Sequence, residues 1–284
     1  MSTTHIDNSN HNSNNRSDTE SFEMLNKQLI ENGLNEIRHH IAELSATHHI
    51  TRPIQLIAVS KLKPVSMIKY AYTLGQRDYG ENYVQELISK INDPVFSNCN
   101  DIRWHFIGHL QSNKCNQLIK QSHHKLYCVH SCDSIKLLDS LNKACINAQY
   151  SHKLRVLIQV NTSNETNKSG CEPKECIELY QHCVTHCSAL QASGLMTIGA
   201  ADDNNQRKYF NELVQCKKRI IDELGSVVNA DEFELSMGMS GDYTTAIECE
   251  STMIRIGSTI FGKRDYPAAT TESVDQNQAE TLEQ

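Results

Sequence analysis

Short apolar runs rich in β-branched and aromatic residues recur along the chain, and they alternate with segments of helical spacing. An apolar run of this length, bounded by polar or turn residues, is typical of a buried strand. The pattern predicts eight strands, at residues 56–60, 78–81, 102–108, 125–130, 154–160, 190–197, 233–237 and 253–256.

Apolar residues in the intervening segments recur at intervals of three and four, which predicts helices with one buried face. Such stripes occur around 65–72, 135–145 and 210–224. Helix starts are indicated by proline or capping residues at Pro64, Pro173, Asp133, Ser134 and Asp242. A further helix is predicted ahead of the first strand, because one apolar stripe contains Leu25, Leu29, Leu34, Ile37, Ile41 and Leu44.

This alternation predicts an α/β fold, namely a single-domain (β/α)8 TIM-type barrel with an additional N-terminal helix. We expect residues 21–266 to form the barrel. An open doubly wound sheet is the alternative fold, but no GxGxxG follows the first strand. Residues 1–20 and 267–284 are polar and lack periodicity, so both are predicted to be disordered tails.

Composition narrows the class of protein. The 284 residues carry a formal net charge of -7 with both signs interspersed, which argues against a nucleic-acid or anionic-membrane surface. The chain shows no signal-peptide core and no apolar run near the ~20 residues of a membrane span, so we expect a cytoplasmic protein. Eleven cysteines are present without a CxxC pair, and we expect reduced core thiols and no zinc site.

Polar residues lie at or just after the ends of the predicted strands, where a barrel has its ligand site. Lys61 is the most informative, because burial disfavours an ammonium group and lowers the amine pKa. A neutral amine condenses with an aldehyde to form a Schiff base. The alternative is an ordinary surface lysine at a strand end. The other candidates at these ends are Asn82, His109, Ser131, Asn161, Ser240 and Arg255.

Two loops of small residues follow the last two predicted strands, one around Ser240 and one at Gly257-Ser258. Such loops let backbone N–H groups approach a phosphate, and barrels often bind phosphate after strands seven and eight. Ordinary tight turns remain the alternative. A lysine, a phosphate cradle and the buried Arg255 together fit pyridoxal 5′-phosphate.

Six segments carry a resemblance to a known family: AVSKLKP (58–64), YGENYVQE (79–86), WHFIGHLQSNK (104–114), GLMTIG (194–199), LSMGMSGDY (235–243) and RIGSTIFGKRDY (255–266). Together they resemble the pyridoxal phosphate homeostasis protein family, of the YggS and PROSC type. The resemblance implies a barrel related to the N-terminal domain of alanine racemase, with Lys61 in a Schiff base with the cofactor.

The resemblance also implies roles for the other candidates. Ser240 and the Gly257-Ser258 turn would hold the phosphate, and Arg255 would face the pyridine nitrogen. Asn82, His109 and Met237 would line the pocket. Ser258 stands where many members have threonine, which retains the hydroxyl.

The resemblance implies a binding protein without catalytic activity. An arginine keeps the pyridine nitrogen neutral, so the ring is a weak electron sink. A racemase also needs an acid/base group on the other face of the cofactor ring, and we expect no second domain here to supply it. We therefore expect a monomer that buffers pyridoxal phosphate or delivers it to apo-enzymes in vitamin B6 homeostasis. A racemase-like enzyme, a class I aldolase and a purely structural barrel remain alternatives. No metal site is expected at His105 and His109, because His105 is predicted to be a hydrogen-bonded residue inside a strand.

Overall fold

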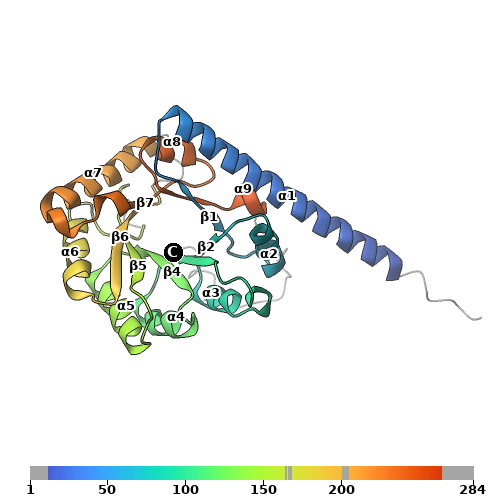
Figure 1. The fold of residues 1–284 in the computed structure, drawn as a ribbon, viewed down its shortest axis with the longest axis horizontal. Helices are drawn as coiled ribbons and strands as arrows, with labels where there is room; N and C mark the ends of the chain where they lie inside the picture. Colours follow the sequence, from blue (N-terminus) through green and yellow to red (C-terminus); the bar gives the residue numbers. More distant parts are fainter. Residues whose placement is uncertain (1–11, 164, 166–167, 200–204, 264–284) are drawn as a thin grey trace, which may run out of the picture.

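Eight parallel strands form a closed barrel in the computed structural model, which describes residues 12–163, 165, 168–199 and 205–263 (Figure 1). Each strand is hydrogen-bonded to the next one along the chain, and the last strand closes on the first. The strands are β1 (Gln55–Val59), β2 (Asp78–Glu81), β3 (Arg103–Phe106), β4 (Leu126–Cys132), β5 (Leu154–Gln159), β6 (Leu190–Met196), β7 (Glu234–Ser236) and β8 (Met253–Ile256). The predicted barrel is confirmed, and the open doubly wound sheet is excluded.

Helices surround the ring of strands, and each strand is followed by a helix in chain order (Figure 1). The helices after the strands are α2 (Val65–Thr73), α3 (Val84–Ile91), α4 (Cys115–Gln121), α5 (Ile135–Asn147), α6 (Cys176–His186), α7 (Gln206–Leu224), α8 (Tyr243–Glu248) and α9 (Ser258–Phe261). Short 3₁₀ turns occupy Pro94–Phe96, Ser112–Lys114, Gly225–Val227 and Ala230–Glu232.

The main apolar core lies between the strands and the helices, where Trp104, Phe106 and Phe210 are buried. The barrel interior is different, because among the described residues its apolar side chains form a separate, smaller cluster of Ile57, Cys128, Leu157, Met196 and Met253. All eleven cysteines are buried and carry free thiols, in agreement with their predicted place in the core.

Helix α1 (Asn12–Thr47) packs beside α2, α8 and α9 and extends beyond the barrel (Figure 1). Leu34 and Ile37 of the predicted stripe are buried, whereas Leu25 is 66% exposed, so the stripe does not reach the N-terminal part of the helix. Gly33 allows α1 and α9 to approach closely, since a Cβ there would lie 2.2 Å from the Thr259 carbonyl oxygen.

The described part of α1 begins at Asn12, earlier than the expected start of the folded body at residue 21. The first residues of α1 are polar, so the sequence shows no apolar stripe there from which a helix could be predicted. Residues 1–11 and 264–284 lie outside the described residues, so the division into tail, barrel and tail stays a prediction. Among the described residues, no helix combines the length and apolar character needed to cross a bilayer.

Local capping explains several helix starts. Ser134 is the N-cap of α5, and its hydroxyl accepts a hydrogen bond from the Leu137 N–H, as predicted. Pro64 precedes the first residue of α2. Pro173 lies ahead of α6, which begins only at Cys176, so it does not occupy the first turn of that helix.

Candidate functional site

A pocket of about 420 Å³ lies at the carboxyl ends of the strands, where barrel enzymes bind their ligands. Six of the predicted site residues line it together: Lys61, Asn82, Ser240, Arg255, Gly257 and Ser258. The remaining lining residues are Val59, Lys63, Ile107, Met196, Ile198, Met239, Gly241 and Gly262. The apolar members were missed because they alternate with core residues at strand ends, where the sequence does not show which way a side chain points.

His109 does not line this pocket with Lys61. Strand β3 ends at Phe106, so the inward-outward alternation of the strand no longer places side chains beyond it. The His109 side chain is 53% exposed, and its Nδ1 lies 3.1 Å from Ser169 Oγ and 3.8 Å from a carboxylate oxygen of Asp133.

Met237 is also absent from the pocket, because it is fully buried in the outer core. The side chain of Ser236 points into the barrel, where its Oγ is bonded to Arg255 and His130. Adjacent residues of an extended chain point to opposite sides, so Met237 faces the helices. Met237 was predicted to line the pocket, but in this structure its side chain packs in the outer core.

Lys61 occupies the second position of a tight turn that follows β1. The Lys63 N–H donates to the Ser60 carbonyl oxygen at 3.1 Å, which closes the turn. Leu62 at the third position has φ 60°, in the left-handed region. That conformation costs a residue with a Cβ about 1–2 kcal/mol, so surrounding contacts must hold the turn in place.

A buried ion cluster supplies those contacts. The ammonium group of Lys90 on α3 donates to the Ser60 carbonyl oxygen at 2.7 Å and to carboxylate oxygens of Glu81 at 2.8 Å and Glu86 at 2.7 Å. Glu86 in turn accepts the Leu62 N–H at 2.6 Å. Two acidic groups and one ammonium thus fix both sides of the Lys61 turn.

Within this cluster, burial raises the pKa of Glu81 to about 7, and the neighbouring Lys90 charge opposes that rise. Lys90 was missed in the sequence. The only signal was its spacing of four residues from Glu86, which is also common in exposed helix pairs.

Arg255 is buried on β8 and borders the pocket. Its NH1 donates to Ser236 Oγ at 2.8 Å, and its NH2 donates to the Thr197 carbonyl oxygen at 2.9 Å. Burial lowers the pKa of the guanidinium to about 10, against the attraction of the Asp242 charge. Arg255 therefore remains protonated at neutral pH and brings a positive charge to the pocket.

A chain of hydrogen bonds runs from Arg255 through the barrel interior to Asp78. Ser236 Oγ lies 3.0 Å from His130 Nδ1, His130 Nε2 lies 2.9 Å from His105 Nδ1, and His105 Nε2 lies 3.0 Å from Asp78 Oδ1. Burial lowers the pKa of both histidines, so each ring is neutral and has one donor and one acceptor.

These constraints give the chain one direction. Because the Asp78 carboxylate only accepts, His105 donates to it from Nε2 and accepts from His130 at Nδ1. His130 then accepts the Ser236 hydroxyl proton, and the Ser236 oxygen accepts from Arg255. The prediction that His105 is a hydrogen-bonded interior residue is confirmed.

Two loops meet beside the lysine turn, because the strand that precedes one of them, β8, pairs with β1. The hydroxyl of Ser258, at the start of α9, donates to Ser240 Oγ at 3.2 Å. Asp242 is the N-cap residue of α8, as predicted, but its carboxylate accepts the Met239 N–H at 2.6 Å and so closes the Ser240 loop. Asn82 adds a buried side-chain oxygen that has no hydrogen-bond partner in the described structure. Hydroxyls, an unpaired amide oxygen and a cation therefore face the same space.

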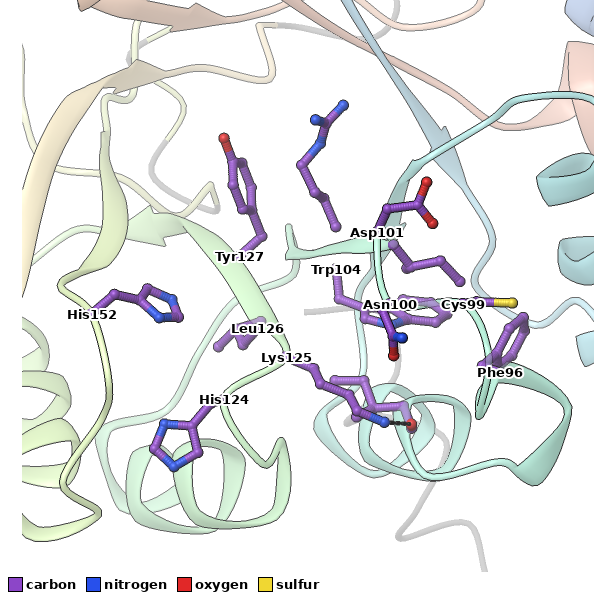
Figure 2. Close-up of a pocket in the computed structure, with 13 residues that line it drawn as sticks. Phe96, Cys99, Asn100, Asp101, Trp104, His124, Lys125, Leu126, Tyr127 and His152 are labelled. Carbon is purple, nitrogen blue, oxygen red and sulfur yellow. Dashed lines mark hydrogen bonds between the residues drawn. The ribbon is translucent and has the colours of Figure 1, made fainter.

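A second pocket, of about 290 Å³, lies at the amino ends of β3 and β4 (Figure 2). Its lysine, Lys125, donates from Nζ to the Ile91 carbonyl oxygen at 3.3 Å. Trp104 and Tyr127 form much of its wall (Figure 2). None of the predicted site residues lines it, and this end of a barrel serves stability rather than chemistry.

Comparisons with known proteins agree with the fold. The family described as "Alanine racemase, N-terminal domain" matches residues 33–265. The pyridoxal phosphate homeostasis protein of Bos taurus is 43% identical over 229 residues, which cover 79% of this chain and 82% of that protein.

Solved structures extend the comparison. The structure of PipY from Synechococcus elongatus with PLP bound has a TM-score of 0.62 at 30% identity, covering 78% of this chain and 100% of that one. An alanine racemase from Clostridium difficile has a TM-score of 0.60 at 15% identity, covering 86% of this chain and 60% of that one. This last likeness shows the barrel fold alone.

Proposed function

Since this chain belongs to the pyridoxal phosphate homeostasis protein family, we propose that it binds pyridoxal 5′-phosphate in the pocket at the carboxyl ends of its strands. The observation that carries this proposal is the meeting of Lys61, Ser240, Ser258 and Arg255 around one space of about 420 Å³. The PLP-bound structure of PipY supports it.

Each group in the pocket has a role in this proposal. The bound cofactor supplies an aldehyde that a primary amine can capture reversibly. Lys61 Nζ would be the amine that forms a Schiff base with it, and the clamped turn keeps this amine at the pocket wall. The hydroxyls of Ser240 and Ser258 and the backbone at Gly257 hold the phosphate.

Arg255 faces the pyridine nitrogen in this proposal, held by Ser236 and the Thr197 carbonyl oxygen. A protonated arginine donates a hydrogen bond to that nitrogen and leaves it without a proton of its own. The ring is then a weak electron sink, which disfavours carbanion chemistry.

The ionisable groups of the pocket favour a carrier over a racemase. In the described structure they are Lys61, Lys63 and Arg255, with no tyrosine or histidine to act as a second acid/base group. Lys63 Nζ donates to the Lys263 carbonyl oxygen at 2.9 Å. We therefore propose that the protein buffers pyridoxal phosphate and delivers it to apo-enzymes. A racemase-like enzyme is the alternative.

A visible absorption titration with pyridoxal phosphate tests the binding site. The wild type and Lys63→Ala should both develop the band of a lysine-bound cofactor, whereas Lys61→Ala should not. If Lys63→Ala loses the band and Lys61→Ala keeps it, the proposed attachment is wrong.

A transfer assay tests delivery separately. Loaded protein is mixed with an apo-enzyme that depends on pyridoxal phosphate, while a scavenger removes free aldehyde. Recovery of the enzyme's activity supports delivery, and no recovery contradicts it. Incorporation of solvent deuterium at the α-position of any amino acid in a panel would instead favour the racemase.

A further inference from the structure

A cluster of metal-ligating side chains lies between α5 and α6, outside the pocket. Asp139 comes from α5, His182 from α6, and Cys187 is the C-cap residue of α6. His182 Nε2 lies 2.7 Å from Asp139 Oδ1, and Cys187 Sγ lies 4.0 Å from the same oxygen. The three ligand atoms all lie within 4.8 Å of one another.

A second thiol adjoins this cluster. Cys183 lies one helical turn before Cys187, and the Cys187 N–H donates to the Cys183 carbonyl oxygen at 3.2 Å. One carboxylate, one imidazole and one thiol from two neighbouring helices thus lie within 4.8 Å of one another, and a second thiol is one helical turn away.

We propose that Asp139, His182, Cys183 and Cys187 form a zinc site. Nitrogen, sulfur and carboxylate ligands at ~2.0–2.3 Å from a tetrahedral Zn²⁺ lie about 3.3–3.8 Å from one another. The 2.7 Å contact between His182 and Asp139 needs only to widen, and the 4.0 Å contact between Cys187 and Asp139 needs only to shorten.

The described structure holds a second cluster of metal-ligating side chains, but solvent does not reach it. His105, Cys128 and His130 also lie close together, but they are fully buried inside the barrel. Their ring nitrogens are committed to the chain between Asp78 and Ser236. By contrast, the Asp139 side chain is 56% exposed, and that of His182 is 19% exposed, so an ion can reach them from solvent.

Zinc binding at this site releases protons. Each thiol gives its proton to solvent as its sulfur becomes a thiolate ligand, and His182 binds through a neutral nitrogen. The metal would join α5 to α6 close to an existing link, in which Asn142 Oδ1 accepts the Ala189 N–H at 2.9 Å. Cysteine spacing did not predict this site, because Asp139 comes from a different helix.

Cobalt substitution of the tag-free, fully reduced chain tests the proposal without pyridoxal phosphate. The wild type should bind one Co²⁺ per chain, with a thiolate charge-transfer band and the visible bands of tetrahedral cobalt, and Zn²⁺ should displace it. Cys187→Ser and the exposed Asp139→Asn should each lose these bands. Cys216→Ala should keep them, because its thiol contacts the Pro173 carbonyl oxygen and Arg219, away from the site.

Two readouts decide the outcome. Zinc should raise the thermal unfolding midpoint of the wild type and of Cys216→Ala, and should leave that of Asp139→Asn unchanged. Absence of a thiolate band in the wild type, or retention of the band in both Cys187→Ser and Asp139→Asn, would overturn the proposal. The binding of pyridoxal phosphate is unaffected by either result.

Discussion

Asp78 lies at the far end of the hydrogen-bond chain from Arg255, and its ionisation should make a measurable contribution to stability. Burial alone would raise the pKa of its carboxyl, but hydrogen bonds from His105 and Arg103 outweigh that effect and lower the pKa to about 2 from its ordinary 3.8. Arg103 donates to both carboxylate oxygens, from Nε at 2.6 Å and from Nη2 at 2.5 Å.

The magnitude follows from linkage. A carboxyl whose pKa is lower in the folded state stabilises that state above its unfolded pKa, and the stabilisation is lost as the pH falls through the folded pKa. A shift from 3.8 to about 2 corresponds to about 2 kcal/mol at neutral pH. About half of this contribution should be lost by about pH 3.

Urea unfolding of the wild type and Asp78→Asn at several pH values tests the prediction. The difference between their free energies of unfolding should be constant from about pH 7 to about pH 5, and it should shrink by about 1 kcal/mol at about pH 3. A difference that does not change between neutral pH and about pH 3 would refute the assigned role of Asp78.

Three further substitutions test the environment of the pocket. Lys90→Met leaves the buried Glu81 without its cation, so it should lower the free energy of unfolding, measured in urea, by about 3–5 kcal/mol. A loss below about 1 kcal/mol would show that the ion cluster does not hold the lysine turn. Leu62→Gly should raise the free energy of unfolding by about 1 kcal/mol, because glycine adopts the left-handed φ of 60° without strain. Leu62→Ala should give no such gain, and equal effects of the two substitutions would contradict this reasoning. Gly108→Ala places a Cβ 2.1 Å from the Asn82 carbonyl oxygen, so it should lower the melting temperature and weaken the binding of pyridoxal phosphate. If the melting temperature and the affinity both stay at their wild-type values, the backbone there is free to move.

The fold was predictable because its signal is repeated. Eight apolar runs alternate with helical stripes, and each of the eight runs overlaps a strand of the barrel. The differences between prediction and structure lie at the ends of helices and strands. The buried stripe of α1 was predicted to include Leu25, but Leu25 is exposed. Strand β4 continues to Cys132, so Ser131 lies within the strand and not after it.

The site was predictable where a residue falls on a strand or just past its end and its side chain points inward. Lys61, Asn82 and Arg255 satisfy that condition, and all three line the pocket. His109 lies beyond the end of β3, and Met237 directly follows β7 but points outward, so neither lines the pocket. The ion cluster around Lys90 could not be predicted, because it joins groups from a turn, a strand and a helix whose proximity appears only in the folded barrel.

The most direct test of the account is peptide mapping after borohydride reduction of the protein loaded with pyridoxal phosphate. Reduction converts a Schiff base into a stable secondary amine, so the attached lysine keeps the mass of the cofactor. We predict that the modification lies on Lys61 and that none lies on Lys63, which is two residues away in the same turn. A modification on another lysine, or on none, would contradict the account.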